Sequence, residues 1–233
     1  MFNKQIGRNV EVYVDDMLVK SREEKSHLDD LKETFNTRRQ YNTKLNKTKF
    51  AFGVSLGKFL SFMVSQRGIE ANPEKVNAIF EMSSPKMVKE VQSLTGRITL
   101  NRFVSRAIDK CLPFFKILKQ VFVWKDECEA AFQELKCYLS NPPLLSPSKE
   151  GEDLFLYLVV SMTAVSATLI WEEQKVQRSV YYISQAFQGA KARYPRMEKI
   201  TFALIIAYRK FCPYFQANPI ILMMDQPIKK AIE

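Results

Sequence analysis

The adjacent aspartates in VEVYVDDMLVK, residues 10–20, constrain the fold of this chain more than any other feature. Short apolar segments lie on both sides of the two negative charges. Two runs rich in β-branched and other apolar residues around turn-forming residues predict a β-hairpin. We therefore expect strands at 10–14 and 17–21, with Asp15 and Asp16 at the tight turn, because aspartate tolerates the backbone conformations of turns.

A pair of carboxylates at the tip of a hairpin can also hold a divalent metal ion. Mg²⁺ prefers oxygen ligands, keeps several waters and commonly adds substrate phosphates. Two such ions about 3.5–4 Å apart can activate a hydroxyl group and stabilise the leaving group of a displacement. The residues alone leave two interpretations open: a turn that needs aspartate, or a site for Mg²⁺ (or Mn²⁺).

The pattern after the hairpin predicts a mixture of helices and short strands as far as residue 140. Ser26 with Asp29 predicts a capping box, and Leu28, Leu31 and Phe35 form the apolar stripe of the helix that follows. Residues 49–70 predict two or three strands with glycine turns. Further helix starts are expected at Asn72-Pro73, at Ser84-Pro85, with a helical pattern from there to about Gln120, and at Asp126 with Glu129. The last of these helices would present Cys128, Ala131, Phe132, Leu135 and Leu139 on one face.

The second half of the chain predicts a separate α/β layer. The proline-rich segment 141–153 is the best candidate for a linker. After it we expect strands near 154–160, 164–171 and 177–183, a helix at about 197–211, a strand at 219–224 and the start of another helix. This order predicts a mixed sheet.

One apolar stretch requires a comparison with membrane spans. Leu154 to Trp171 holds 18 residues without a charge, the lower limit for a spanning helix. It is rich in β-branched residues, and both of its flanks are acidic rather than basic. Two buried strands joined near 161–163 explain the stretch better, and we expect no membrane association.

The charge distribution points to a polyanionic partner without requiring one. The net charge is +10, and no acid occurs between Thr34 and Ile69. Aromatic residues interleave with the basic residues of that stretch. This pattern is typical of grooves that follow a nucleic-acid backbone. It is equally typical of an aromatic core whose solvent-exposed face carries lysines. The seven basic residues are Arg38, Arg39, Lys44, Lys47, Lys49, Lys58 and Arg67.

The cysteines and the single histidine do not predict a metal site. The four cysteines have no CxxC spacing, so a structural zinc site is not expected. Reduced thiols fit a cytoplasmic or nuclear protein that is not secreted. His27 lies at a polar helix start, where we expect a solvated side chain.

Several motifs, in order, resemble the Pol polyprotein of gypsy-like long-terminal-repeat retrotransposons, most closely those of plants. YVDDMLVKS resembles the reverse transcriptase active-site hairpin, and HLDDLKETF resembles the helix that follows it. KLNKTKFAFGVSLGKFLSFMVSQRGIEANPEKVNAI and VKEVQSLTGRITLNRFVS resemble the following palm segment and the thumb. FVWKDECEAAFQELKCYLSNPPLL resembles the connection helix before RNase H. Nearly the whole chain is covered.

The resemblance implies four regions. These are a partial palm with the YVDD hairpin and primer grip at 1–70, thumb and connection helices at 71–140, a linker at 141–153, and an RNase H-like domain at 154–233. The implied fold is α+β and α/β, with a helical thumb and a mixed-sheet RNase H-like domain. FLSFMV, residues 59–64, matches the primer-grip hairpin, and Ser61 stands in it where the family has glycine.

The resemblance also assigns roles to residues of the first region. Asp15 and Asp16 correspond to two of three metal-binding carboxylates of a polymerase that uses an RNA template and dNTPs. Lys49 corresponds to a proton donor to pyrophosphate. Tyr13 and the acid-free stretch would contact template, primer or RNA–DNA duplex through Tyr13, Arg38, Arg39, Lys44, Lys47, Lys58, Phe59 and Arg67. The third carboxylate is expected upstream of Met1, in the remainder of the polyprotein, so we expect weak Mg²⁺ binding and no polymerase activity from this chain alone.

The RNase H-like region departs from its family at a catalytic position. In YLVVSMTAVSATL, Val159 stands where the family has aspartate. Glu198 and Asp225 match two other acids, and the fourth would lie beyond Glu233. We therefore expect a degenerate RNase H-like domain with Glu198 and Asp225 as remnants.

Three hypotheses follow for the function. The chain is a fragment of an RNA-directed DNA polymerase, a non-catalytic nucleic-acid-binding remnant, or the product of a decayed element without a function. The first two place it in a cytoplasmic retrotransposon particle or in the nucleus.

Overall fold

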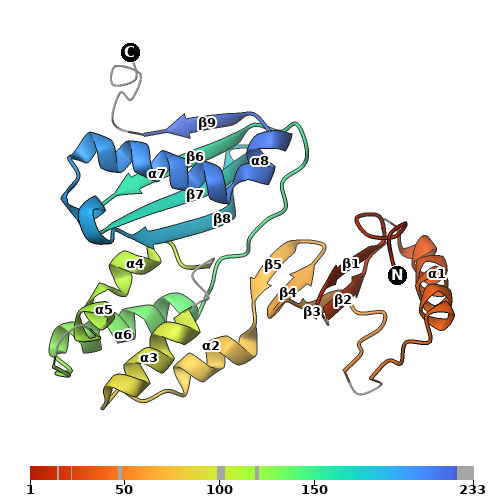
Figure 1. Ribbon diagram of the computed structural model, residues 1–233, viewed down its shortest axis with the longest axis horizontal. Helices are drawn as coiled ribbons and strands as arrows, with labels where there is room; N and C mark the ends of the chain where they lie inside the picture. Colours follow the sequence, from red (N-terminus) through yellow and green to blue (C-terminus); the bar gives the residue numbers. More distant parts are fainter. Residues whose placement is uncertain (15, 22, 47–48, 99–102, 119–120, 225–233) are drawn as a thin grey trace. The chain divides into compact units, whose positions relative to one another are not determined.

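The computed structural model describes residues 1–14, 16–21, 23–46, 49–98, 103–118 and 121–224, and these form two compact units (Figure 1). The first unit comprises residues 1–66 and the second comprises residues 67–233. Helices and strands occur in both, which confirms the expected mixed α and β fold. The four region boundaries predicted above remain predictions.

The first unit consists of two hairpins and one long helix. The first hairpin pairs β1 (Val10–Tyr13) with β2 (Asp16–Val19). A short 3-10 helix (Glu24–Ser26) leads directly into α1 (His27–Gln40). The second hairpin pairs β3 (Leu56–Phe59) with β4 (Phe62–Ser65), within the range predicted for strands.

The start of α1 differs from the expected capping box. Ser26 precedes the helix, but its hydroxyl donates to the carbonyl of Glu23 at 2.9 Å and caps no helical N–H group. The preceding 3-10 turn holds Ser26 in a helical conformation, whereas a capping residue is normally extended. The expected apolar stripe is also wrong at Leu28, which is 66% exposed.

The turn of the second hairpin places two ordinary residues in the left-handed region. Leu60 has φ +50° and Ser61 has φ +67°. A two-residue hairpin loop of this kind matches the twist of its strands but favours glycine or asparagine. Ser61 therefore occupies a position where glycine would remove backbone strain.

The helices of the second unit follow strand β5 (Gly68–Ala71). Asn72 caps α2 (Pro73–Phe80) by accepting from the N–H of Glu74 at 3.0 Å, as the Asn-Pro pair predicted. The remaining helices before the large sheet are α3 (Val88–Arg97), α4 (Ala107–Lys110), α5 (Leu112–Ile117) and α6 (Asp126–Leu139).

Two predicted helix starts in this unit are wrong in detail. The helix expected at Ser84-Pro85 begins at Val88, and Pro85 is buried instead. Asp126 is the first residue of α6 rather than its cap, and Glu129 accepts from the indole N–H of Trp124 at 2.8 Å. The predicted apolar face of α6 is confirmed at its four buried positions, Cys128, Phe132, Leu135 and Leu139.

The proline-rich segment 141–153 packs within the second unit. Leu145 and Ile69 exchange two backbone hydrogen bonds of 2.9 and 3.0 Å. Gly68 has φ +139°, and a Cβ atom there would lie 2.0 Å from the carbonyl oxygen of Leu145. Only glycine permits this close approach of the two backbones.

A four-stranded mixed sheet forms the centre of the second unit. Its order is β8 (Val176–Ala186), β7 (Ala164–Glu173), β6 (Leu154–Val160), β9 (Ile220–Met223). β9 runs parallel to β6 and the other pairs are antiparallel, as the mixed-sheet prediction required. The stretch 154–171 thus forms two strands, and within the described ranges no helix is long and apolar enough to cross a bilayer.

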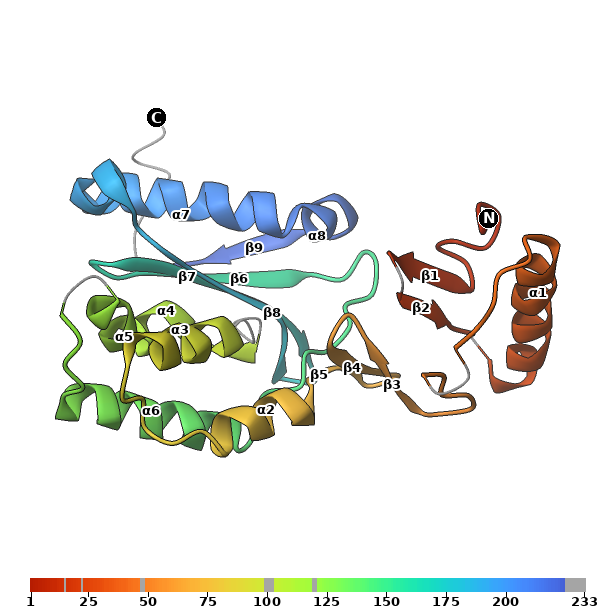
Figure 2. The same cartoon turned by 60° about the horizontal axis from the view of Figure 1, so that its bottom comes forward.

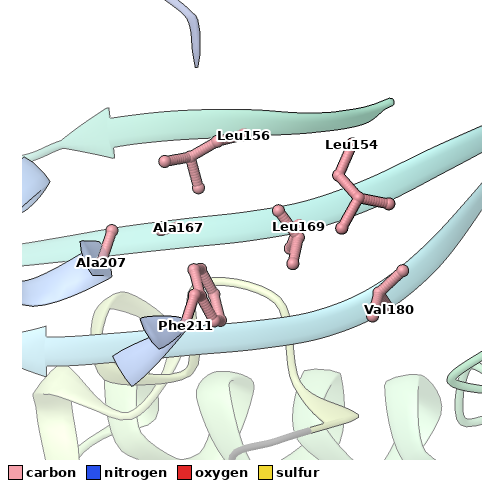
Figure 3. Close-up of a cluster of buried hydrophobic side chains, with 7 residues drawn as sticks. All are labelled: Leu154, Leu156, Ala167, Leu169, Val180, Ala207 and Phe211. Atoms are coloured by element: carbon pink, nitrogen blue, oxygen red, sulfur yellow. The ribbon is translucent and has the colours of Figure 1, made fainter. Parts of the chain in front are cut away.

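Helices cover both faces of this sheet (Figure 2). A short 3-10 helix (Gly189–Arg193) leads to α7 (Arg196–Lys210), which packs on one face and continues into α8 (Cys212–Ala217). α4 lies against β7 and β8 on the opposite face. The side chains between α7 and the sheet form a buried apolar cluster of Leu154, Leu156, Ala167, Leu169, Val180, Ala207 and Phe211 (Figure 3).

Candidate functional site: the carboxylate hairpin and the sheet end

The turn of the carboxylate hairpin lies one residue earlier than expected. Tyr13 pairs with Asp16, so the turn follows Tyr13 and Asp16 is the first residue of β2. Val14 has φ +51° and is 82% exposed. A β-branched residue rarely adopts this conformation, which explains why the sequence did not predict it. Asp15 lies outside the described residues.

Asp16 is presented on a regular strand rather than on a flexible turn. Its side chain is exposed, and Tyr13 directly opposite is 62% exposed. Among the described residues, the side chain of Asp16 has no hydrogen-bond or ion-pair partner. Its carboxylate is therefore free to accept an external ligand.

The base of this hairpin is fixed to α1 by a set of hydrogen bonds that sequence reasoning missed. Asn9, which precedes β1, donates through Nδ2 to Asp30 at 2.8 Å and to Glu33 at 3.1 Å. Ser21, which follows β2, donates to the other Asp30 oxygen at 2.6 Å. The backbone N–H of Lys20 donates to the carbonyl of Asn9 at 2.9 Å and continues the strand pairing. One carboxylate on α1 thus holds the two ends of the hairpin together.

Two titratable groups take part in this cluster. The hydrogen bond from Ser21, followed by that from Asn9, lowers the pKa of Asp30 below its usual value. Nδ1 of His27 lies 3.0 Å from the Ser21 hydroxyl, so the expectation of a merely solvated histidine was wrong. The Ser21 hydroxyl therefore contacts both Asp30 and the ring of His27.

Four of the eight predicted nucleic-acid contacts are exposed residues of the first unit, namely Tyr13, Arg39, Lys44 and Lys58. Arg39 and Lys44 lie in and just after α1, and Lys58 lies in β3 beside the half-buried Phe59. Arg38 is half-buried and donates to the carbonyl of Lys44 at 3.1 Å. Lys49 and Arg67 are also exposed, the latter at the start of the second unit, whereas Lys47 lies outside the described residues. These assignments stay predictions.

The RNase H-like acids do not assemble into a cluster in the part of the chain that the structure describes. Val159 lies in β6 opposite Ser166 and is 45% exposed. Glu198 is exposed in the first turn of α7, and Asp225 lies beyond the described residues. Lys199, the residue after Glu198, is buried. Its ammonium group donates to the carbonyl of Met162 at 3.2 Å and so ties α7 to the turn between β6 and β7.

The two regions differ in their fit to a divalent metal ion. No group of three potential ligands occurs among the described residues. Asp16 supplies an exposed carboxylate oxygen of the type that Mg²⁺ prefers, with Asp15 as its neighbour in sequence. At the sheet end, a valine methyl group at position 159 cannot ligate a cation. Asp16 therefore offers one ligand to a metal that other groups also bind, whereas position 159 offers none.

Comparison with known proteins supports the order of the motifs. Residues 124–222 match the model of the RNase H-like domain found in reverse transcriptase. The Pol polyproteins of transposons 412 and opus from Drosophila melanogaster are 27% and 26% identical over 92% and 100% of this chain, and the Tf2-3 polyprotein of Schizosaccharomyces pombe is 25% identical over 90%. The chain spans 18%, 25% and 16% of the lengths of these relatives.

Solved structures show the same fold. The foamy viral protease-reverse transcriptase in complex with an RNA/DNA hybrid matches 95% of this chain with a TM-score of 0.79 at 20% identity, and the chain covers 31% of it. The complex of that protein with double-stranded DNA matches 99% with a TM-score of 0.78, also at 20% identity, over 49% of its length. The chain is therefore similar to the part of retrotransposon Pol polyproteins that carries a reverse transcriptase-associated RNase H-like domain.

Proposed function

We propose that this chain is part of an RNA-directed DNA polymerase from a gypsy-like retrotransposon of the plant type. The observation that carries the proposal is the exposed, unpartnered Asp16 on a strand whose base is fixed to α1. Rigid placement of carboxylates is what metal-assisted phosphoryl transfer requires, because the protein contributes mainly positioning and charge. The similarity of the ordered motifs to Pol polyproteins supports the same assignment.

In the intact polyprotein, Asp15 and Asp16 would hold Mg²⁺ or Mn²⁺ together with further ligands. A bound metal would activate the primer hydroxyl and stabilise the developing charge on pyrophosphate. The chain's own residues supply the two carboxylates, the aromatic wall of Tyr13 beside them and the cations that would face template and primer. Two carboxylates alone hold Mg²⁺ weakly, so we expect no polymerase activity from this chain alone.

Primer extension tests this proposal. The purified chain, given Mg²⁺, dNTPs and an RNA template with a DNA primer, should give no product. The same chain joined to the segment that precedes the matching region in a related Pol polyprotein should extend the primer, and Asp16→Asn should abolish that activity. Extension by the isolated chain that disappears in Asp16→Asn would show that no further carboxylate is needed. Extension that persists in Asp16→Asn would contradict the assignment of the hairpin.

The RNase H-like region serves as a non-catalytic connecting domain in this proposal. Val159 preserves the strand but removes an oxygen ligand from the sheet end. We expect no Mg²⁺-dependent cleavage of the RNA strand of a hybrid. Cleavage that is lost in Glu198→Gln would contradict this part of the proposal.

A second candidate function, nucleic-acid binding without catalysis, is favoured by the distribution of charge. Arg39, Lys44, Lys49 and Lys58 are exposed within a stretch that contains no acid from 34 to 69. Neutralising phosphates releases counterions, so binding to an RNA–DNA duplex should weaken steeply with salt. Absence of binding at low salt, or a flat salt response, would exclude this candidate.

A further inference from the structure

Three phenylalanines form an aromatic cluster in the first unit. The rings of Phe50 and Phe52 lie 5.8 Å apart between centroids and are nearly parallel, at 14°. The ring of Phe35, from α1, lies 6.0 Å from that of Phe52 at 56°. Although it packs on two rings, Phe52 keeps 55% of its surface exposed, whereas Phe35 and Phe50 are half-buried. Phe52 is thus the ring that contacts both others and is also the most exposed of the three.

Basic residues lie near this cluster in the sequence and on helix α1. Arg38 and Arg39 follow Phe35 by three and four positions, which places them one turn further along the same side of α1. The exposed Lys49 directly precedes Phe50. The stretch from 34 to 69, which contains Phe35, Phe50 and Phe52, holds basic residues and no acid.

We propose that Phe52 is a stacking platform for an unpaired base of a single-stranded nucleic acid, with Arg39 and Lys49 binding the adjacent phosphates. This inference rests on the nucleic-acid binding proposed above and assigns it a specific site. A planar base would stack on the exposed part of the Phe52 ring, which the contacts with Phe50 and Phe35 hold in place. Stacking is tolerant of sequence because every base has a π-face, and it is commonly combined with a cationic path for the backbone.

A nucleic acid fits this surface better than a protein partner does. An apolar protein patch would cover Phe52 but would gain nothing from the neighbouring cations. A single strand supplies both a flat ring for Phe52 and a negative backbone for the basic residues. The long lysine and arginine side chains can follow that backbone while the base remains on the ring.

The experiment compares two ligands and several variants. Fluorescence anisotropy measures binding of the full chain to a labelled single-stranded oligonucleotide and to a matched oligonucleotide with abasic positions. Wild-type protein should prefer the oligonucleotide with bases. Phe52→Ala should weaken binding to it by on the order of ten-fold, with an unchanged salt slope because no charge is removed. Phe52→Trp should restore the affinity, and its new fluorescence should be quenched by the bases.

Two control variants distinguish the contribution of base stacking from that of charge, and from the effect of removing any aromatic ring. Arg39→Gln should lower the salt slope by about one unit while the preference for bases over abasic positions remains. Phe80→Ala removes a partly exposed ring from α2 in the second unit and should leave both affinities unchanged.

The outcomes distinguish this site from the proposed function as a whole. Equal affinity of wild type for the two oligonucleotides, or a Phe52→Ala variant that binds like wild type, would overturn the stacking site while leaving nucleic-acid binding intact. A Phe52→Ala variant that keeps its affinity but loses self-association would identify the ring as a protein contact instead. If wild type binds neither oligonucleotide at low salt, both proposals fail.

Discussion

The two units achieve order in different ways. Among the described residues of the first unit, the buried hydrophobic side chains are Phe2 and Val10, whereas Gln5, Asn9 and Thr34 are buried polar residues. In the second unit, whole strands and helix faces are buried and apolar, including the cluster beneath α7. The hairpin that carries Asp16 therefore depends on hydrogen bonds at its base, and the sheet of the second unit depends on a hydrophobic core.

This difference means that a unit can keep its fold while a residue expected to be catalytic is replaced. The second unit keeps its sheet although a valine replaces the aspartate expected at position 159, because that position is partly exposed and outside the core. The first unit keeps the acidic residues but places them on a sparsely buried element. Local loss of a few polar contacts would thus disturb the hairpin, and the sheet would tolerate changes at its end.

The largest expected effect is in the hydrophobic core. Phe211 is fully buried and its ring lies 5.5 Å from that of Tyr181. Phe211→Ala should lower the free energy of unfolding of the second unit by about 3–5 kcal/mol, because it leaves a cavity. Denaturant unfolding followed by the fluorescence of Trp124 and Trp171, both in this unit, measures the change. Ile205→Ala, at an exposed position of α7, should cost less than about 1 kcal/mol; equal costs would refute the position of the core.

The next effect is at the base of the carboxylate hairpin. Asn9→Ala removes the donor to Asp30 and Glu33, and should destabilise the first unit by about 1–2 kcal/mol. The loss is limited because Oδ1 of Asn9 is itself buried without a partner. His27, the single histidine, provides an NMR signal specific to this unit. Asn36→Ala on the exposed face of α1 is the matched control, and a similar loss there would show that the hydrogen bonds are unimportant.

A stabilising substitution is expected in the second hairpin. Ser61→Gly should raise the free energy of unfolding of the first unit by about 0.5–1 kcal/mol, because glycine adopts φ +67° without strain. Ser55→Gly, at a residue without positive φ, should instead lower it slightly. Thermal melts that show both changes with the same sign would contradict the strained turn.

The smallest effect concerns pH. The pKa of Asp30 is lowered in the folded protein, chiefly by the hydrogen bond from Ser21, so its ionised form stabilises the first unit. That contribution is complete above the ordinary pKa of 3.8 and is lost as the pH falls through the lowered value. Asp30→Asn should therefore flatten the acid end of the stability profile of this unit. A steeper loss of stability in acid after this substitution would reverse the expected sign.

Sequence reasoning succeeded where burial determines the structure. The strands at 154–160, 164–173 and 176–186 and the helix at 196–210 lie within three residues of their predicted bounds, because long apolar patterns report a buried face. It failed at the hairpin turn, where Val14 adopts a conformation that its side chain disfavours. It also missed the contact between Asn9 and Asp30, which are separated by 21 positions and share no local pattern.

The most direct test of the contrast between the two acidic sites is a measurement of Mn²⁺ binding by the chain in complex with an RNA–DNA duplex. Electron paramagnetic resonance of free Mn²⁺ gives the affinity for wild type, Asp16→Asn and Glu198→Gln. We predict weak binding by wild type, weaker binding by Asp16→Asn and no change in Glu198→Gln. A loss of affinity in Glu198→Gln with Asp16→Asn unchanged would contradict the assignment of the hairpin as the metal-binding element.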